Sequence, residues 1–412
     1  MVVQGLSSIP EAVGTELVYA ARGNKQPDFF SYNPANDSWS ALPPWPNGAE
    51  AKPPAKGSCA TPLTGNGMIY ALKGANTQGF WKFNTATDSW TPLAPIPLGA
   101  TNKRVKGGTD LVYVPGAVPD SDRVYCLKGY KNEFWQYNPN NDSWRPLTNA
   151  PSEKYGPGSW IALVEGLVGS SGRRIYCHTA KTHGFNAYDP STGTWGPALT
   201  GMPLLGMMGK SKKSKDGGSA ITYENSIYAL KGGNTQEFWR YTISDTAAGL
   251  WKELDTIGLM GQGSTKKKKV GKGGDITLIV PSSKGVPADL PALKGNGTNE
   301  LWMYNTGVTF GQPEPRRDGV TAATVGNRHQ SLVIAPNPLA AGFAQLSYSL
   351  PRAGALAIHV YDVTGRTVVT QTTVTGRTGA LGLDLRQLAD GVYLVRLDAD
   401  GYSTQQKLVV QH

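Results

Sequence analysis

One short pattern recurs over roughly the first three quarters of the 412-residue chain. A run such as IYALKGA is followed by an aromatic run such as FWKFN and, in five of six copies, by a tryptophan. The copies begin at Val18, Ile69, Val124, Ile175, Ile227 and Leu290. The tryptophans, Trp39, Trp90, Trp144, Trp195 and Trp251, are spaced by 51, 54, 51 and 56 residues. A period of this length is typical of repeat architectures, in which each unit buries its apolar faces against its neighbours.

Each unit is predicted to contain only short strands. Apolar residues alternate within the runs, as half-buried strands require. The 51 glycines and 29 prolines are about 19 % of the chain, against ~12 % in average proteins, which favours short strands joined by turns. A glycine-ended strand, an aromatic strand and then a tryptophan, at this period, resembles the kelch family over roughly residues 1–310. The six copies predict a six-bladed kelch-like β-propeller over residues 1–312.

The start of the chain is expected to close the ring. The sixth copy has no tryptophan strand after Tyr304. The segment Val3–Pro10 aligns with Trp90–Pro97, with leucine, isoleucine and proline in register. Residues 2–8 are therefore predicted to form the outer strand of the last blade, and the first blade is predicted to lack its innermost strand. The segment has no basic, apolar signal sequence, as expected of a mature or trimmed chain.

The last 80 residues are predicted to form a separate small domain. A linker at 313–331 precedes several short alternating runs over 332–412, which indicate an antiparallel sandwich. The motifs APNP, VYDVTGR and LADGVYLVRL contain Pro336, Asn337, Pro338, Tyr361, Asp362, Gly365, Arg366, Gly391 and Tyr393. Their order closely resembles the type A C-terminal sorting domain of the type IX secretion system. The resemblance implies an Ig-like β-sandwich, export by type IX-like machinery, and a secreted or outer cell-surface location.

Charged residues recur at the hairpin between the second and third strand of the repeat. A basic residue precedes the turn glycine in five copies, at Arg22, Lys73, Lys128, Lys231 and Lys294, and an acid follows in four, at Asp28, Glu133, Glu237 and Glu300. This pattern predicts structural ion pairs across the hairpin, each worth ~0.2–1 kcal/mol if exposed. A charged ring for an anionic ligand is the alternative. Lys73, whose copy has Gly79 in place of the acid, is predicted to be free for a ligand.

Lysines also gather in the loops that lead from one repeat to the next. With a net charge of +10, the chain is expected to have one strongly positive face. Its members include Lys103, Arg104, Lys106, Lys210, Lys212, Lys213, Lys266, Lys267, Lys268 and Lys269. The face is either simply solvated or a docking site for an acidic partner, such as an anionic surface glycan or another copy. The expected surface location argues against nucleic acid.

Catalytic signatures are sparse. The sequence has no HExxH, GxSxG or calcium-loop motif. His178 and His183 flank one turn without a visible third ligand, so no metal is expected there. The three cysteines are predicted to be buried thiols, and no cofactor is expected. No apolar run approaches the ~18 residues that a membrane-spanning helix needs.

These features favour a non-enzymatic extracellular protein, with no catalytic residues. It would act either as a self-assembling, possibly filamentous, structure or as an adhesive binding protein, including a monomeric glycan-binding adhesin. The alternative is a carbohydrate-active kelch enzyme of the sialic-acid mutarotase type. Glu133, Glu237, Lys73 or Arg22 would then serve as acid or base in the central channel. The fold alone does not choose between these functions.

Overall fold

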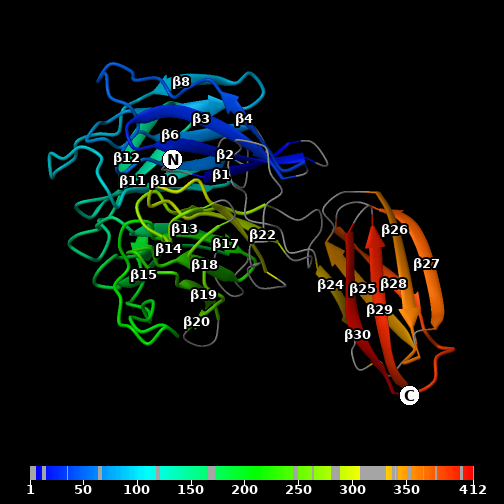
Figure 1. Cartoon of the computed structure of the whole chain (residues 1–412). Coiled ribbons are helices and arrows are strands. Elements are labelled where there is room, and N and C mark those ends of the chain that lie inside the picture. Colours follow the sequence, from blue (N-terminus) through cyan, green and yellow to red (C-terminus); the bar gives the residue numbers. More distant parts are fainter. Residues whose placement is uncertain are drawn as a thin grey trace. The chain divides into compact units, whose positions relative to one another are not determined.

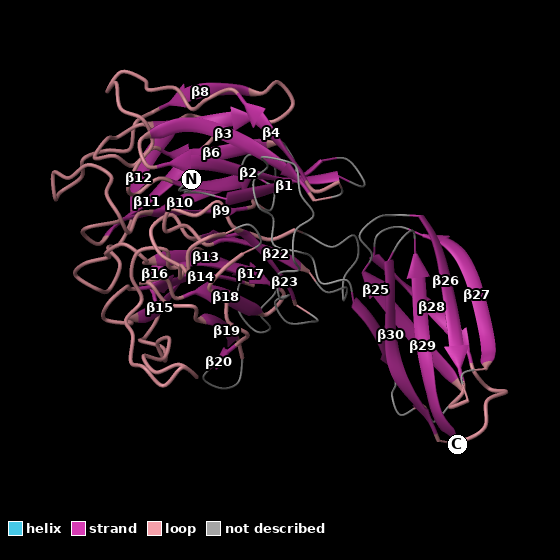
Figure 2. Cartoon of the chain, in the orientation of Figure 1, coloured by secondary structure: helices cyan, strands magenta, loops and turns pink. Residues whose placement is uncertain are grey.

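The computed structural model divides the chain into two compact units, residues 1–327 and 328–412. It describes residues 6–11, 15–34, 36–63, 67–116, 121–165, 172–244, 249–261, 264–279, 288–306, 331–335, 339, 342–349, 354–364, 366–375, 378–399 and 402–411. All regular elements of these residues are strands, and no helix among them is long and apolar enough to cross a membrane (Figures 1 and 2). The predicted linker, except for Ser331, lies outside the described residues.

The first unit is a β-propeller whose described strands form six antiparallel sheets. The first three blades are β1 (Leu6–Glu11), β2 (Thr15–Gly23), β3 (Gln26–Asn33) and β4 (Ser38–Leu42); β5 (Cys59–Leu63), β6 (Met68–Leu72), β7 (Phe80–Asn84) and β8 (Ser89–Leu93); and β9 (Asp110–Val114), β10 (Arg123–Lys128), β11 (Glu133–Asn138) and β12 (Ser143–Pro146). The others are β13 (Trp160–Glu165), β14 (Arg173–His178), β15 (Phe185–Asp189) and β16 (Thr194–Trp195); β17 (Ser219–Tyr223), β18 (Ser226–Leu230), β19 (Phe238–Thr242) and β20 (Leu250–Glu253); and β21 (Asp275–Ile276), β22 (Asp289–Leu293) and β23 (Leu301–Asn305).

The repeated aromatic residues hold neighbouring blades together. Phe80 of β7 packs edge-on against Tyr137 of β11 and Trp144 of β12, with ring centroids 4.8 and 4.9 Å away. The indole N–H of Trp144 donates to the carbonyl of Ala94 in the loop that leaves the preceding blade, at 2.9 Å. Trp90, Trp195 and Trp251 make the equivalent bond. These four tryptophans therefore join their own blade to the one before.

The N-terminal strand differs from the expectation. β1 pairs with β2, with Leu6 opposite Ala20, and lies next to β5, so it is the innermost strand of the first blade. The prediction that residues 2–8 complete the last blade is wrong for Leu6–Ser8, and residues 2–5 lie outside the described residues. An antiparallel pair needs only a short connection, so the short spacing between Pro10 and Val18 marks a hairpin rather than a missing strand.

The described strands of the last blade are β21, β22 and β23. This blade packs against the first blade. Val18, Ala20 and Tyr32 of the first blade form one buried cluster with Leu293, Leu301 and Met303 of the last. Side-chain packing therefore joins the first and last blades.

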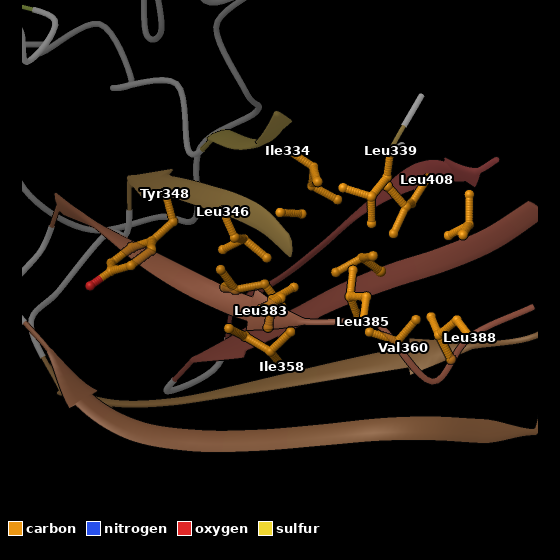
Figure 3. Close-up of a cluster of buried hydrophobic side chains, with 14 of the residues drawn as sticks. Ile334, Leu339, Leu346, Tyr348, Ile358, Val360, Leu383, Leu385, Leu388 and Leu408 are labelled. Carbon is orange, nitrogen blue, oxygen red and sulfur yellow. The ribbon is translucent and has the colours of Figure 1, made fainter. Parts of the chain in front are cut away.

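The second unit is a two-sheet β-sandwich. One sheet has the order β24 (Ser331–Ala335), β25 (Phe343–Ser349), β28 (Thr378–Asp384), and the other β27 (Thr367–Thr375), β26 (Gly354–Tyr361), β29 (Gly391–Ala399), β30 (Tyr402–Val410). The apolar side chains of the two sheets, including Leu346, Leu383 and Ile358, form one buried core (Figure 3). All the residues of this core belong to the second unit.

Candidate functional site

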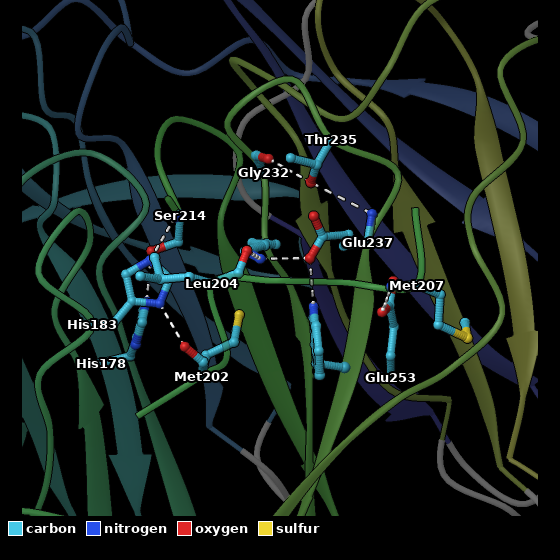
Figure 4. A network of polar contacts seen from close by, with 12 residues as sticks. His178, His183, Met202, Leu204, Met207, Ser214, Gly232, Thr235, Glu237 and Glu253 are labelled. Atoms are coloured by element: carbon cyan, nitrogen blue, oxygen red, sulfur yellow. Dashed lines mark hydrogen bonds and ion pairs between the residues drawn. The ribbon is translucent and has the colours of Figure 1, made fainter. Parts of the chain in front are cut away.

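The charged hairpins of the propeller form a set of buried clamps. In the fifth blade, the ammonium of Lys231, at the end of the β18 segment, lies 2.5 Å from the carboxylate of Glu237 and donates to the carbonyl of Leu204 at 2.9 Å. The indole N–H of Trp239 donates to the same carboxylate at 3.1 Å. Figure 4 shows this network around Glu237. Leu204 belongs to the loop leaving the fourth blade, so the clamp ties two blades together.

The same arrangement recurs in two further blades. Lys128 pairs with Glu133 at 3.0 Å and holds the carbonyls of Pro97 and Leu98, while Lys294 pairs with Glu300 at 2.6 Å and holds Leu259. All three lysine side chains are at most 1 % exposed. The predicted ion pairs are present in these three blades, and they are buried because the loop from the preceding blade covers the turn. The predicted Arg22–Asp28 pair is also present, with side chains about 40 % exposed, so the small contribution of an exposed pair applies to it.

Lys73 is not free for a ligand. Its side chain is buried, and its ammonium donates to the carbonyls of Pro46 and Asn47 and lies 5.1 Å from the ring centre of Trp81. Burial lowers its pKa to about 8, although Glu50 opposes the shift. The preceding loop covers this cation as it does the other three. The hairpin cations described so far are therefore structural, apart from the partly exposed Arg22.

In the fourth blade, a histidine network replaces the clamp (Figure 4). Nδ1 of His183 must donate to the carbonyl of Met202, 2.6 Å away, because Nε2 of the same ring accepts from the amide of Ser214 at 3.0 Å. Both ring nitrogens are thus in use, and His183 is neutral. His178 stacks on Trp160, and burial lowers its pKa to about 3. The described residues include no group of three side chains able to hold a metal.

The basic loops surround the clamps at the same end of the propeller. Lys103, Lys210, Lys212, Lys213, Lys266 and Lys267 are exposed, Lys268 and Lys269 are half-buried, and none makes an ion pair with the described residues. Arg104 is exposed but pairs with Glu50 at 2.8 Å. Lys106 and Lys154 both lie over the ring of Tyr130, at 4.6 and 5.0 Å from its centre. Most of the positive charge predicted for this face is available to a partner.

A small cavity lies where the innermost strands of five blades begin. This cavity of about 90 Å³ is lined by the turns that begin the innermost strands of the second to sixth blades. Small-molecule sites usually measure ~300–1,000 Å³. Asp110 lies at this cavity, and burial raises its pKa to about 7, although the amides of Ile161 and Leu111 bond the carboxylate. The proposed acid–base groups Arg22, Lys73, Glu133 and Glu237 are not among the residues that line this cavity.

The sorting-domain residues are only partly described. Pro336, Asn337, Pro338 and Gly365 lie outside the described residues. Asp362 organises the turn after β26, because its carboxylate accepts from the amide and hydroxyl of Thr364 and from the side chain of Arg366, at 2.9, 2.6 and 3.2 Å. These bonds lower the pKa of Asp362. Tyr361 ends β26, while β29 contains Gly391 and Tyr393, whose hydroxyl donates to Ala389.

Comparison with known protein families identifies the second unit. Residues 333–411 match the family model of the secretion system C-terminal sorting domain. The chain therefore carries a sorting tail of the type IX secretion system, which implies interaction with that machinery and export to the cell surface or the extracellular space.

The propeller has distant relatives. The chain is 26 % identical over 167 residues to mouse Kelch-like protein 35, covering 39 % of this chain and 25 % of that protein. It is 24 % identical over 253 residues to a xyloglucanase from a Paenibacillus species, covering 55 % and 24 %. Among solved structures, PorZ of Porphyromonas gingivalis, a surface component of its type IX secretion system, has a TM-score of 0.44 at 12 % identity, covering 99 % and 59 %. The chain spans about a quarter of these two curated relatives.

Proposed function

We propose that this exported propeller is a non-enzymatic binding protein that holds an anionic glycan at the cell surface through its basic loops. The observation that carries the proposal is that the propeller has two kinds of lysine, buried and paired ones in the hairpins and exposed ones in the loops. The buried lysines of the hairpins are bound to carboxylates or loop carbonyls, whereas the lysines of the loops around them are exposed and without an acidic partner among the described residues. A cluster of exposed cations at one end of a rigid disc attracts polyanions over about a Debye length.

The aromatic side chain at this end supports a carbohydrate partner. Tyr130 is 39 % exposed, and the ammonium groups of Lys106 and Lys154 lie over its ring. An aromatic ring provides an apolar platform with a polar tip, and the adjacent lysines would bind carboxylate or sulfate groups of a sugar. The described cavity at the channel, at about 90 Å³, is smaller than the ~300–1,000 Å³ of usual small-molecule sites.

Binding to dextran sulfate, with neutral dextran as the uncharged comparison, tests the proposal. Reversing two exposed loop charges, with Lys266→Glu and Lys267→Glu, is expected to weaken binding at least tenfold. The matched control reverses two exposed charges on outer strands, with Arg145→Glu on β12 and Lys252→Glu on β20, and should weaken it far less. Equal losses in both variants would show that net charge, rather than this face, governs binding.

Self-association is a second candidate function, favoured by strand β27. Among the described strands it pairs only with β26, and its sequence TVVTQTTVT has no charge, proline or glycine. Natural edge strands usually carry such residues to prevent pairing with another copy. If two copies pair here, Thr370→Lys and Thr372→Lys should abolish particles larger than one chain in light scattering. A wild-type chain that stays monomeric at high concentration would exclude this function.

A further inference from the structure

Four loops that leave a blade share one turn. In each, the amide three residues after a glycine donates to the glycine carbonyl: Ala51 to Gly48, Asn102 to Gly99, Gly209 to Gly206 and Ser264 to Gly261, at 2.9–3.1 Å. In each, a clamp lysine also holds a carbonyl just before the turn. The loops therefore have the same framework, and they differ in what the middle of the turn presents.

The loop of the fourth blade presents methionines. The middle of the turn is Ala49–Glu50 in the first loop and Ala100–Thr101 in the second, but Met207–Met208 in the loop of the fourth blade. Met207 and Met208 are 68 % and 61 % exposed, and Leu205 beside them is 60 % exposed. This is an unusual concentration of apolar surface for a single loop in water.

The methionine turn is held in place rather than frayed. Leu205 pairs with Ser211, and the amide of Lys212 donates to the carbonyl of Leu204 at 2.8 Å, so residues 204–212 form a small hairpin. At the base of the hairpin, Lys231 holds the carbonyl of Leu204. At the turn, the amide of Met207 donates to the carboxylate of Glu253 at 2.5 Å. The apolar side chains are thus presented to solvent by an ordered support.

Lysines border the apolar tip. Lys210, Lys212 and Lys213 lie on the returning arm of the hairpin and are exposed, and Lys266 and Lys267 are exposed on the corresponding loop of the next blade. Apolar side chains beside a row of lysines are the arrangement by which proteins lie on an anionic lipid surface: the apolar groups enter the acyl boundary and the cations meet the phosphates.

We propose that the hairpin 204–213 inserts Leu205, Met207 and Met208 into a lipid surface that carries phosphate groups. The charge complementarity of its lysines favours such a surface over an uncharged apolar partner. The unbranched, flexible methionine side chain suits an irregular acyl layer. The inference shares the lysines of the proposed glycan face, but its apolar contact is independent of that function.

Cosedimentation of the intact chain with vesicles tests the inference. Wild-type protein should bind vesicles of phosphatidylglycerol and phosphatidylcholine, and bind vesicles of phosphatidylcholine alone much more weakly. Met207→Ala with Met208→Thr gives this turn the residues of the equivalent loop at Ala100–Thr101, and should weaken binding at least tenfold. The matched control is Leu250→Thr, which removes an apolar side chain that is 74 % exposed but lies on β20 outside the hairpin; it should bind as wild type does.

Three outcomes of the vesicle and light-scattering experiments would contradict the lipid inference. The lipid inference fails if wild-type protein binds neither vesicle, or if the methionine variant binds as tightly as wild type. Light scattering distinguishes lipid binding from pairing with a second copy of the chain. If the methionine variant loses a dimer that wild type forms, the hairpin is an interface between copies and the lipid assignment is wrong. Dextran sulfate binding of the methionine variant should stay unchanged, so the glycan proposal is judged separately.

Discussion

Removal of one clamp lysine is the sharpest stability test, because the chain contains a buried and an exposed version of the same pair. In Lys231→Met, the carboxylate of Glu237 stays buried and loses the ammonium of Lys231, one of its two described side-chain donors; the indole N–H of Trp239 is the other. The carbonyl of Leu204 loses its hydrogen bond from the same ammonium. Breaking a buried pair by removing one partner costs about 3–5 kcal/mol. In Arg22→Met, both partners of the pair are about 40 % exposed, and the expected cost is ~0.2–1 kcal/mol.

Tryptophan fluorescence during guanidinium unfolding measures this difference in the intact chain. All 11 tryptophans precede residue 303, so the signal reports the propeller and not the sorting domain. The double variant Lys231→Met, Glu237→Gln should recover part of the loss, because it leaves no uncompensated charge. Equal free energies of unfolding for Lys231→Met and Arg22→Met would refute the account of buried clamps.

Two further predictions concern the histidine network and the channel. Burial lowers the pKa of His178 to about 3 from its ordinary 6.5, so the unfolded chain binds a proton on this ring more readily than the folded chain does. The stability that the neutral ring contributes is therefore lost as the pH falls below 6.5. Between pH 7 and pH 5, wild type should lose about 2 kcal/mol of unfolding free energy relative to His178→Gln, measured by unfolding at each pH. An unchanged difference would show that the pKa of His178 is the same in the folded and the unfolded chain, and would contradict its burial as a neutral ring. Gly217 has a φ of +84°, and a Cβ there would clash with the carbonyl oxygen of Gly271, in the loop before the next blade. A Cβ at Gly297, with a φ of +79°, would meet nothing within 4 Å. Gly217→Ala should therefore cost well over the ~1–2 kcal/mol of left-handed strain expected of Gly297→Ala, and equal unfolding midpoints would contradict the packing.

The repeat was sufficient to predict most of the fold, because its strands carry local signals. Leu230 pairs with Phe238 across the hairpin, as the alternating runs around Lys231 and Glu237 predict. The N-terminal strand was misassigned because its likeness to Trp90–Pro97 is one of composition. Whether an edge segment joins the first or the last blade depends on tertiary packing, which a short apolar run does not encode.

The candidate site was harder to predict than the fold. The partners Lys231 and Glu237 are six residues apart and recognisable in the sequence, but their burial depends on Leu204, which lies in the loop of another blade. Lys73 was predicted to be free because its copy lacks the acid, but the loop that leaves the first blade covers it, and its ammonium donates to the carbonyl of Asn47. The methionine turn carried no recognisable motif. Met207–Met208 is recognised as an unusual turn only because the structure shows that Ala100–Thr101 occupies the same position in an equivalent loop with the same backbone hydrogen bond.

The central claim is that the exposed loop lysines, and not the buried clamps, give this exported protein its affinity for an anionic surface. The most direct measurement is the apparent Kd of the intact chain for dextran sulfate as a function of salt concentration. The account predicts that log Kd rises steeply with log salt, and that the slope falls when Lys266 and Lys267 are reversed to glutamate. A salt-independent Kd, or equal affinity for neutral dextran, would contradict it.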